Sequence, residues 1–160
     1  MAAIQANVSK GREVELYNRV DSNDPANSAL IMAVIASGGD ALSVLQDYDT
    51  FTAVFAGASN EVTNAGYARK TLTDANLTAY TVDDTNNWIA LTLPLQTFST
   101  ITAGDTWDIV MIGYESDTTG GTDTNIIPIS FHELRYLGTA ISPNGGNIIV
   151  DFSGGWITAT

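Results

Sequence analysis

The chain has no cysteine among its 160 residues, which excludes disulfide bonds, a thiolate nucleophile and a cysteine-based zinc site. It is also poor in basic residues, with six Lys and Arg against 18 Asp and Glu and a formal net charge of -12. Because such a surface repels phosphate backbones, we expect no nucleic-acid partner. Charged residues make up only 15% of the chain. Thr, Ser, Asn and Gly replace them, a composition typical of β-rich surfaces.

A leader and long apolar runs are missing as well. The N-terminus has neither the basic segment nor the apolar segment of a signal peptide. The longest strongly apolar stretch, residues 29–36, is too short to cross a bilayer, so we expect no membrane partner. A hydrophobic content of 44% predicts a folded chain with a real core. The small polar residues 1–12 predict an N-terminal arm, and residues 13–160 predict a single β-sandwich domain.

Hydrophobic periodicity predicts a mainly β fold. Residues 12–20, "REVELYNRV", alternate and predict a half-buried strand with Val14, Leu16 and Val20 on one face. Residues 28–36 and 106–115 are apolar runs typical of buried strands. The segment "NNWIALTLPLQTF" predicts a strand with one apolar face, and Pro94 predicts an edge or a bulge in it. The apolar face of this strand comprises Ile89, Leu91, Leu93 and Leu95.

One segment has helical spacing. Asp40 is a suitable N-cap and Gly57 a suitable C-terminal stop. The poor helix formers Thr50 and Thr52 indicate that this helix is short or interrupted. Its apolar positions are Leu42, Leu45, Tyr48, Phe51 and Val54. The predicted fold is therefore an antiparallel β-sandwich or jelly roll with one short inserted helix at about residues 41–56.

The residues that carry catalytic chemistry are scarce. His132 is the only histidine, and its neighbour Glu133 would point to the opposite face of a strand. There is no G-x-S-x-G elbow to support a serine triad. We expect His132 to end a strand at the surface or at the edge of the core, and Asp108, beside Trp107, to lie on an exposed face. The sequence thus predicts no enzyme and no cofactor.

The loop in "YESDTTGGTDTNIIPIS", residues 114–130, is the only metal candidate. Asp117, Asp123 and Asn125 flank a Gly-Gly bend and form a weak calcium candidate, since calcium prefers oxygen ligands. The pattern of an EF-hand is absent. A long hairpin tip explains the same residues, because Gly supplies positive φ and Asp and Asn close turns. We therefore expect no bound metal.

Five basic residues are candidates for binding a partner: Lys10, Arg12, Arg19, Arg69 and Lys70. Grouped on an acidic surface, they would suit an acidic loop of another protein. The alternative is that they solvate strand ends. The three Trp residues all fall in predicted strands, where core or interface positions are more common than a sugar-binding platform.

Several phrases carry a resemblance to a known set of proteins: "KGREVELYNRVDSNDPANSALIMAVI", "LQDYDTFTAVFAG", "YARKTLTDANLTAYTVDDTNNWIALTLPLQTF" and "YESDTTGGTDTNIIPIS". Over roughly residues 10–132 the chain resembles virion structural proteins of tailed bacteriophages and related prophages, of the small capsid decoration or cement type. This resemblance implies a non-enzymatic protein of the capsid surface, assembled in the host cytoplasm. The implied partners are the major capsid protein and further copies of this chain in a homo-dimer or trimer. The alternative is a carbohydrate- or host-surface-binding module of a tail or fibre, which requires exposed Trp or Tyr.

Overall fold

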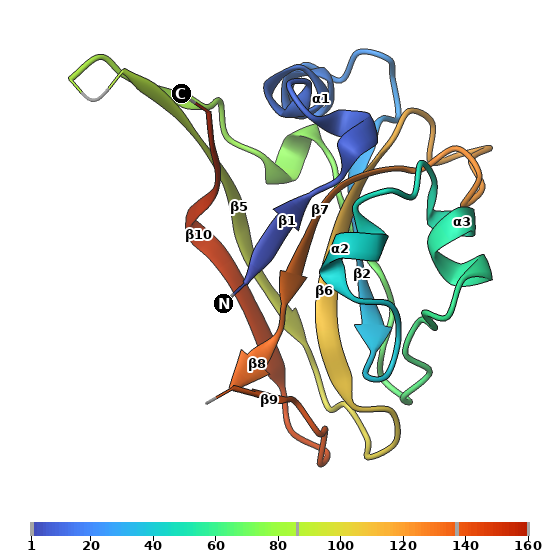
Figure 1. Ribbon diagram of the computed structural model, residues 1–160. Coiled ribbons are helices and arrows are strands. Elements are labelled where there is room, and N and C mark those ends of the chain that lie inside the picture. Colours follow the sequence, from blue (N-terminus) through green and yellow to red (C-terminus); the bar gives the residue numbers. More distant parts are fainter. Residues whose placement is uncertain (1, 86, 137, 160) are drawn as a thin grey trace.

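A computed structural model of the protein describes residues 2–85, 87–136 and 138–159, and two antiparallel sheets pack face to face within them (Figure 1). The first sheet consists of β1 (Ala3–Gln5), β7 (Ile127–Glu133), β6 (Trp107–Glu115), β2 (Ala29–Ala36) and β3 (Lys70–Leu72), in that spatial order. The second sheet consists of β10 (Ile148–Ala159), β5 (Trp88–Phe98) and β4 (Thr81–Asp83). A small hairpin is formed by β8 (Arg135–Tyr136) and β9 (Thr139–Ala140). The predicted mainly β, antiparallel, sandwich-like fold is confirmed.

The main core lies between the two sheets and is built around aromatic rings. Trp107 of β6 packs edge-on against Phe98 of β5, with ring centroids 5.1 Å apart, and Tyr67 stacks on Phe98 at 5.9 Å. The buried indole Nε1 of Trp107 donates a hydrogen bond of 2.9 Å to Asn64 Oδ1. These contacts join the two sheets, and the hydrogen bond satisfies a polar group that burial would otherwise leave unpaired.

A second core covers the outer face of the first sheet. The helices α2 (Leu42–Leu45) and α3 (Phe51–Ala56) pack over this face (Figure 1). This pair is the helix predicted at about residues 41–56, and it is interrupted as the threonines indicated. Thr50 is the N-cap of α3, where its hydroxyl accepts a hydrogen bond of 3.1 Å from the Ala53 amide. In the part of the chain that the structure describes, no helix covers the outer face of the second sheet in this way (Figure 1).

Residues 12–20 correct one prediction. They lie mostly in α1 (Glu13–Asp21), not in a strand. Leu16, Tyr17 and Val20 are fully buried, and they form the stripe of a helix. The apolar residues at even positions fit both the two-residue period of a strand and the 3.6-residue period of a helix. A strand would place Tyr17 on the outer face, but Tyr17 lies in the core. None of the helices in the described residues is long and apolar enough to span a bilayer.

The N-terminal segment corrects a second prediction, because its described residues are not a free arm. β1 pairs with β7 in antiparallel register, and residues 7–9 form a 3-10 turn, η1 (Asn7–Ser9). Ala6 and Ser9 are fully buried, and the Ala6 amide donates to Ile129 O at 2.9 Å. Residues 2–12 therefore belong to the body of the domain, and β1 is an edge strand of the first sheet.

Pro94 marks a bulge in β5, as the sequence predicted. The register of β5 against β10 shifts between Gln96, opposite Val150, and Leu93, opposite Phe152. The extra residue turns Leu95 outward, where it is 48% exposed, although Leu93 is buried. The predicted single apolar face of this strand is thus wrong at Leu95.

Candidate functional site

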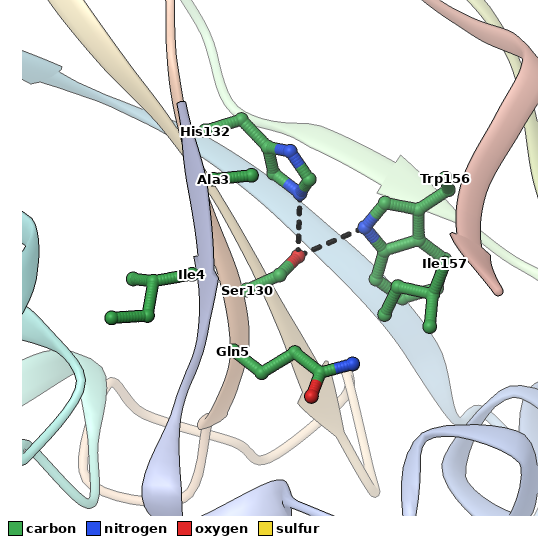
Figure 2. Close-up of a pocket in the computed structure, with 7 residues that line it drawn as sticks. All are labelled: Ala3, Ile4, Gln5, Ser130, His132, Trp156 and Ile157. Atoms are coloured by element: carbon green, nitrogen blue, oxygen red, sulfur yellow. Dashed lines mark hydrogen bonds between the residues drawn. The ribbon is translucent and has the colours of Figure 1, made fainter. Parts of the chain in front are cut away.

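The polar cluster most like a reactive site lies between the sheets, beside β1 (Figure 2). Ser130 and His132 stand two residues apart on β7, so both side chains point to the inner face. Trp156 Nε1 of β10 donates to Ser130 Oγ at 2.8 Å, and Ser130 Oγ lies 2.9 Å from His132 Nε2. Because an indole nitrogen only donates, the serine hydroxyl accepts from Trp156, whereas the direction of its hydrogen bond with His132 depends on the imidazole tautomer.

This geometry is that of a serine beside a base, but its electrostatics suit a structural role. Burial lowers the pKa of His132 to about 4, so the ring is a weak base at neutral pH. Among the described residues, no carboxylate hydrogen-bonds to the ring to stabilise an imidazolium. Ser130 is itself buried. The cluster therefore links the two sheets through Trp156. His132 lies at the edge of the core, and its pairing with Ser130 was signalled by their spacing of two.

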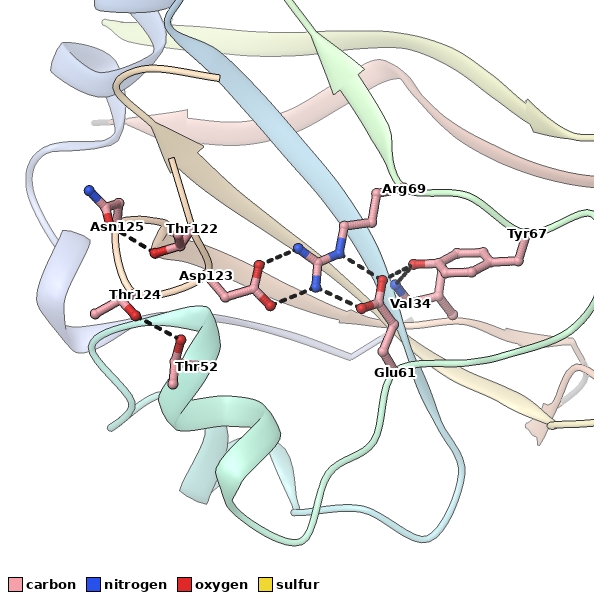
Figure 3. A network of polar contacts seen from close by, with 9 residues as sticks. All are labelled: Val34, Thr52, Glu61, Tyr67, Arg69, Thr122, Asp123, Thr124 and Asn125. Carbon is pink, nitrogen blue, oxygen red and sulfur yellow. Dashed lines mark hydrogen bonds and ion pairs between the residues drawn. The ribbon is translucent and has the colours of Figure 1, made fainter. Parts of the chain in front are cut away.

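Arg69 forms a network of charged side chains with two carboxylates (Figure 3). Its guanidinium binds Asp123 through Nη1 at 2.5 Å and Nη2 at 2.8 Å. It also binds Glu61 through Nε at 2.8 Å and Nη2 at 2.7 Å. The hydrogen bonds to Asp123 and Glu61 raise the pKa of Arg69, and the bond from Arg69 lowers the pKa of Asp123. Two bidentate pairs thus fasten the loop of residues 116–126 to the edge of the first sheet.

The weak calcium candidates have separate partners in this loop. Asp117 Oδ1 accepts hydrogen bonds from the Thr119 amide at 2.9 Å and the Thr119 hydroxyl at 2.6 Å, and these lower its pKa. Asp123 is held by Arg69, and Asn125 Oδ1 accepts from the Thr122 hydroxyl at 3.1 Å. Over the described parts of the chain, no group of three or more His, Cys, Asp or Glu residues is arranged to hold a metal ion. The contacts are those of a hairpin tip.

The predicted partner-binding arginines are neutralised within the chain. Arg12 Nε, at the N-cap of α1, lies 3.2 Å from one oxygen of Glu15, and Arg19 Nε, one turn after Glu15, lies 3.0 Å from the other. Arg69 is bound by its two carboxylates. The acidic partner loop expected from these residues would need free positive charge, which the arginines do not supply.

The two lysines of that set are held more loosely. Lys10 Nζ donates to Asn7 Oδ1 at 2.5 Å. Lys70 Nζ lies 4.8 Å from the centroid of the Phe98 ring, a cation–π contact. Neither lysine has an ion-pair partner among the described residues. A role for the five residues in binding a partner stays a prediction.

The outer face of the second sheet is the open surface of the molecule. Leu95 is 48% and Ile149 57% exposed on this face, beside Thr97, which pairs with Ile149. Trp107 and Trp156 do not add to it, because both are buried between the sheets. An aromatic platform for sugars, as the alternative function requires, is therefore not formed by these two residues.

Fold and site together define an antiparallel two-sheet β protein with one helix-covered sheet and one open sheet. No protein-family model, curated protein or solved structure matches the chain.

Proposed function

We propose that this protein is a non-enzymatic structural protein of a phage virion, a capsid decoration or cement protein that binds the shell of the major capsid protein and stabilises it. The observation that carries the proposal is the open outer face of the second sheet, with Leu95 and Ile149 about half exposed. A sheet face with exposed apolar side chains is a surface suited to another protein. The resemblance over residues 10–132 to phage virion proteins points to the same function.

The mechanism is the addition of buried area at many identical positions. A capsid offers a lattice of equivalent sites, so modest contacts by each copy add up to durable reinforcement. A scaffold built from two packed sheets, with its loop at 116–126 fastened by Arg69, presents a fixed surface to every site. A homo-dimer or trimer of the chain is part of this proposal and would place two or three such surfaces around one symmetry axis.

The charge of the chain predicts the character of the shell surface. Four arginines are ion-paired within the chain, and the net charge is -12. The excess carboxylates require a partner surface with basic side chains. Association should then weaken as salt concentration rises.

Co-sedimentation tests the proposal. Purified protein is mixed with undecorated shells of the major capsid protein from the phage or prophage that carries this chain, and the melting of the shells is followed by calorimetry. We expect saturable binding in a ratio set by capsid symmetry, and shells that melt at a higher temperature. Absence of binding at any salt concentration would refute the function. Sedimentation velocity of the free protein tests the dimer or trimer.

Matched variants test the surface itself. Leu95→Glu with Ile149→Glu is expected to weaken shell binding at least about tenfold, because burying one unpaired charge costs more than 1.4 kcal/mol. Val44→Glu is the control, since Val44 is 44% exposed on α2, over the opposite sheet. Equal binding by both variants would remove the open face from the proposal.

A further inference from the structure

One edge of the second sheet is unpaired. Among the described residues, β10 pairs with β5 alone, so its other edge forms no ladder with a neighbouring strand. A free edge of this kind presents backbone N–H and C=O groups that a further strand can pair with. The edge faces β7 and β1, the border of the first sheet (Figure 1).

Three cavities follow this edge in a row. The first, of about 480 Å³, lies between Ile148 and Ile149 of β10 and residues 139–142. The second, of about 50 Å³, lies between residues 149–152 and residues 132–134. The third, of about 190 Å³, lies between Trp156 and Ile157 on one side and β1 on the other (Figure 2). We call the free edge of β10 with these cavities the β10 seam.

The seam is divided by a bulge. The register of β10 against β5 shifts between Phe152 and Ile157, and the exposed Gly154 and Gly155 lie in between. Gly155 has φ +133°, a conformation that side chains rarely adopt. Because a bulge interrupts the ladder, regular strand addition is confined to residues 148–152.

The charge of the seam is negative. Its cavities are lined by Glu133 and Asp151, and no Lys or Arg of the described residues lines them. Glu133 is already paired with Arg135, whose Nε lies 3.4 Å from Oε1. Among the described residues no cation pairs with Asp151. Hydrogen bonds from the Ser153 side chain and from its amide, the latter at 2.9 Å to Oδ1, lower the pKa of Asp151 and keep it ionised. A segment that lies along residues 148–152 would therefore gain from a positive charge beside Asp151.

We propose that the β10 seam is the docking site for an extended, basic segment of the partner. The segment adds as a strand to the free edge of β10 at residues 148–152, sets a Lys or Arg beside Asp151, and places apolar side chains in the adjoining cavities. Insofar as this partner is the major capsid protein, the inference rests on the proposed function.

A second copy of this chain is a poor occupant of the seam. Each copy carries a net charge of -12, so the acidic surface of a second copy does not complement the negative seam. Arg12, at the N-cap of α1, and Arg19, within α1, are paired with Glu15, and Arg69 is held by two carboxylates. The chain therefore has no free, extended basic segment of its own among these arginines.

Hydrogen exchange on decorated shells tests the seam. We expect those backbone amides of residues 148–152 that point away from β5 to be protected when the protein is bound to shells, compared with the free protein. Asp151→Asn should weaken binding roughly three- to tenfold, since one charge pair is lost. The matched control is Asp117→Asn, because Asp117 closes the same kind of turn with Thr119 and loses the same unit of charge. It should change binding less than about twofold.

The outcomes separate the seam from the proposed function. If the protein decorates shells, but residues 148–152 stay unprotected and the two variants bind equally, the seam is wrong and the function stands. If the protein does not bind shells, the function falls. The seam is then tested on the free protein with two short synthetic peptides, one alternating Val with Lys and one alternating Val with Glu. Protection of residues 148–152 by the Lys peptide alone supports the seam, and protection by neither or by both overturns it.

Discussion

Arg69 binds the loop of residues 116–126 to the first sheet. Its replacement by methionine should destabilise the fold, because two carboxylates would be left without a cation. Methionine keeps an unbranched apolar stem near the rings of Phe51 and Phe55, over which the guanidinium now lies at 5.7 and 5.5 Å. The substitution therefore removes the charge more than the packing. Glu61 and Asp123 would then face each other across the vacated position without a cation.

The magnitude lies between two limits. Breaking a fully buried ion pair costs about 3–5 kcal/mol, and an exposed pair contributes about 0.2–1 kcal/mol. The side chains here are 26% exposed for Arg69, 24% for Glu61 and 36% for Asp123. We expect Arg69→Met to lower the free energy of unfolding by about 2–3 kcal/mol. For a chain of this size that is a fall of roughly 5–10 °C in melting temperature.

The stability difference between wild type and Arg69→Met should depend on pH, and the direction of that dependence can be predicted. Arg69 holds the pKa of Asp123 below its ordinary value of 3.8. A lowered carboxyl pKa stabilises the fold above 3.8, and this contribution is lost as the pH falls below 3.8 through the pKa of the folded state. The difference in stability between wild type and Arg69→Met should therefore be full at about pH 7 and shrink at about pH 3.

Urea denaturation of both proteins at the two pH values measures this. Arg12→Met is the control, because Arg12 and Glu15 are 44% and 46% exposed. It should cost less than about 0.5 kcal/mol. A loss of less than about 0.5 kcal/mol for Arg69→Met, or a loss of equal size at both pH values, would show that the network does not hold the loop as argued.

Three further predictions concern the core and the N-terminus. A Cβ at Gly113 would overlap the Phe51 ring, so Gly113→Ala should cost about 1–3 kcal/mol in urea denaturation, whereas Gly154→Ala, with open space around it, should be nearly neutral. Because the folded pKa of His132 is lowered from 6.5 to about 4, its neutral burial destabilises the fold increasingly as pH falls from 6.5 to 4. The free energy of unfolding of His132→Gln, relative to that of wild type, should therefore rise by up to roughly 3 kcal/mol as the pH falls over that range. A difference between the two proteins that stays constant with pH would contradict this. Removal of residues 2–9 should lower the melting temperature by several degrees, because Ala6 and Ser9 are buried; an unchanged melt would restore the free arm.

The sequence predicted much of the fold because its β signals are local. The apolar run at 29–36 and the alternation up to Leu93 need no knowledge of distant residues, and each became a strand. The signal for an interrupted helix was equally local, because Thr50 and Thr52 weaken the helix within their own segment. Residues 12–20 were predicted wrongly because their apolar residues fit both periods. Only the packing of Tyr17, whose hydroxyl donates to Thr78 O at 2.7 Å, distinguishes a helix there.

The candidate sites depended on distant pairings that spacing does not encode. The contact of Arg69 with Asp123 spans two loops, and it converts a calcium candidate into one half of an ion pair. Ser130 and His132 share a face by their spacing, which a period-two argument could have found, but Trp156 joins them only through the packing of the sheets. The cavities along β10 likewise arise from two strand borders brought together by the fold.

Composition and period thus determined what the sequence by itself can determine: an acidic, cysteine-free chain with mainly β structure and one interrupted helix. Tertiary structure alone decided which strand edges stay free, which carboxylates meet the few arginines, and which sheet face is left open. The physical reason is the distance along the sequence over which each effect acts. Backbone preference and hydrophobic alternation act within a few residues, whereas charge pairing and edge exposure depend on which distant segments the buried core brings side by side.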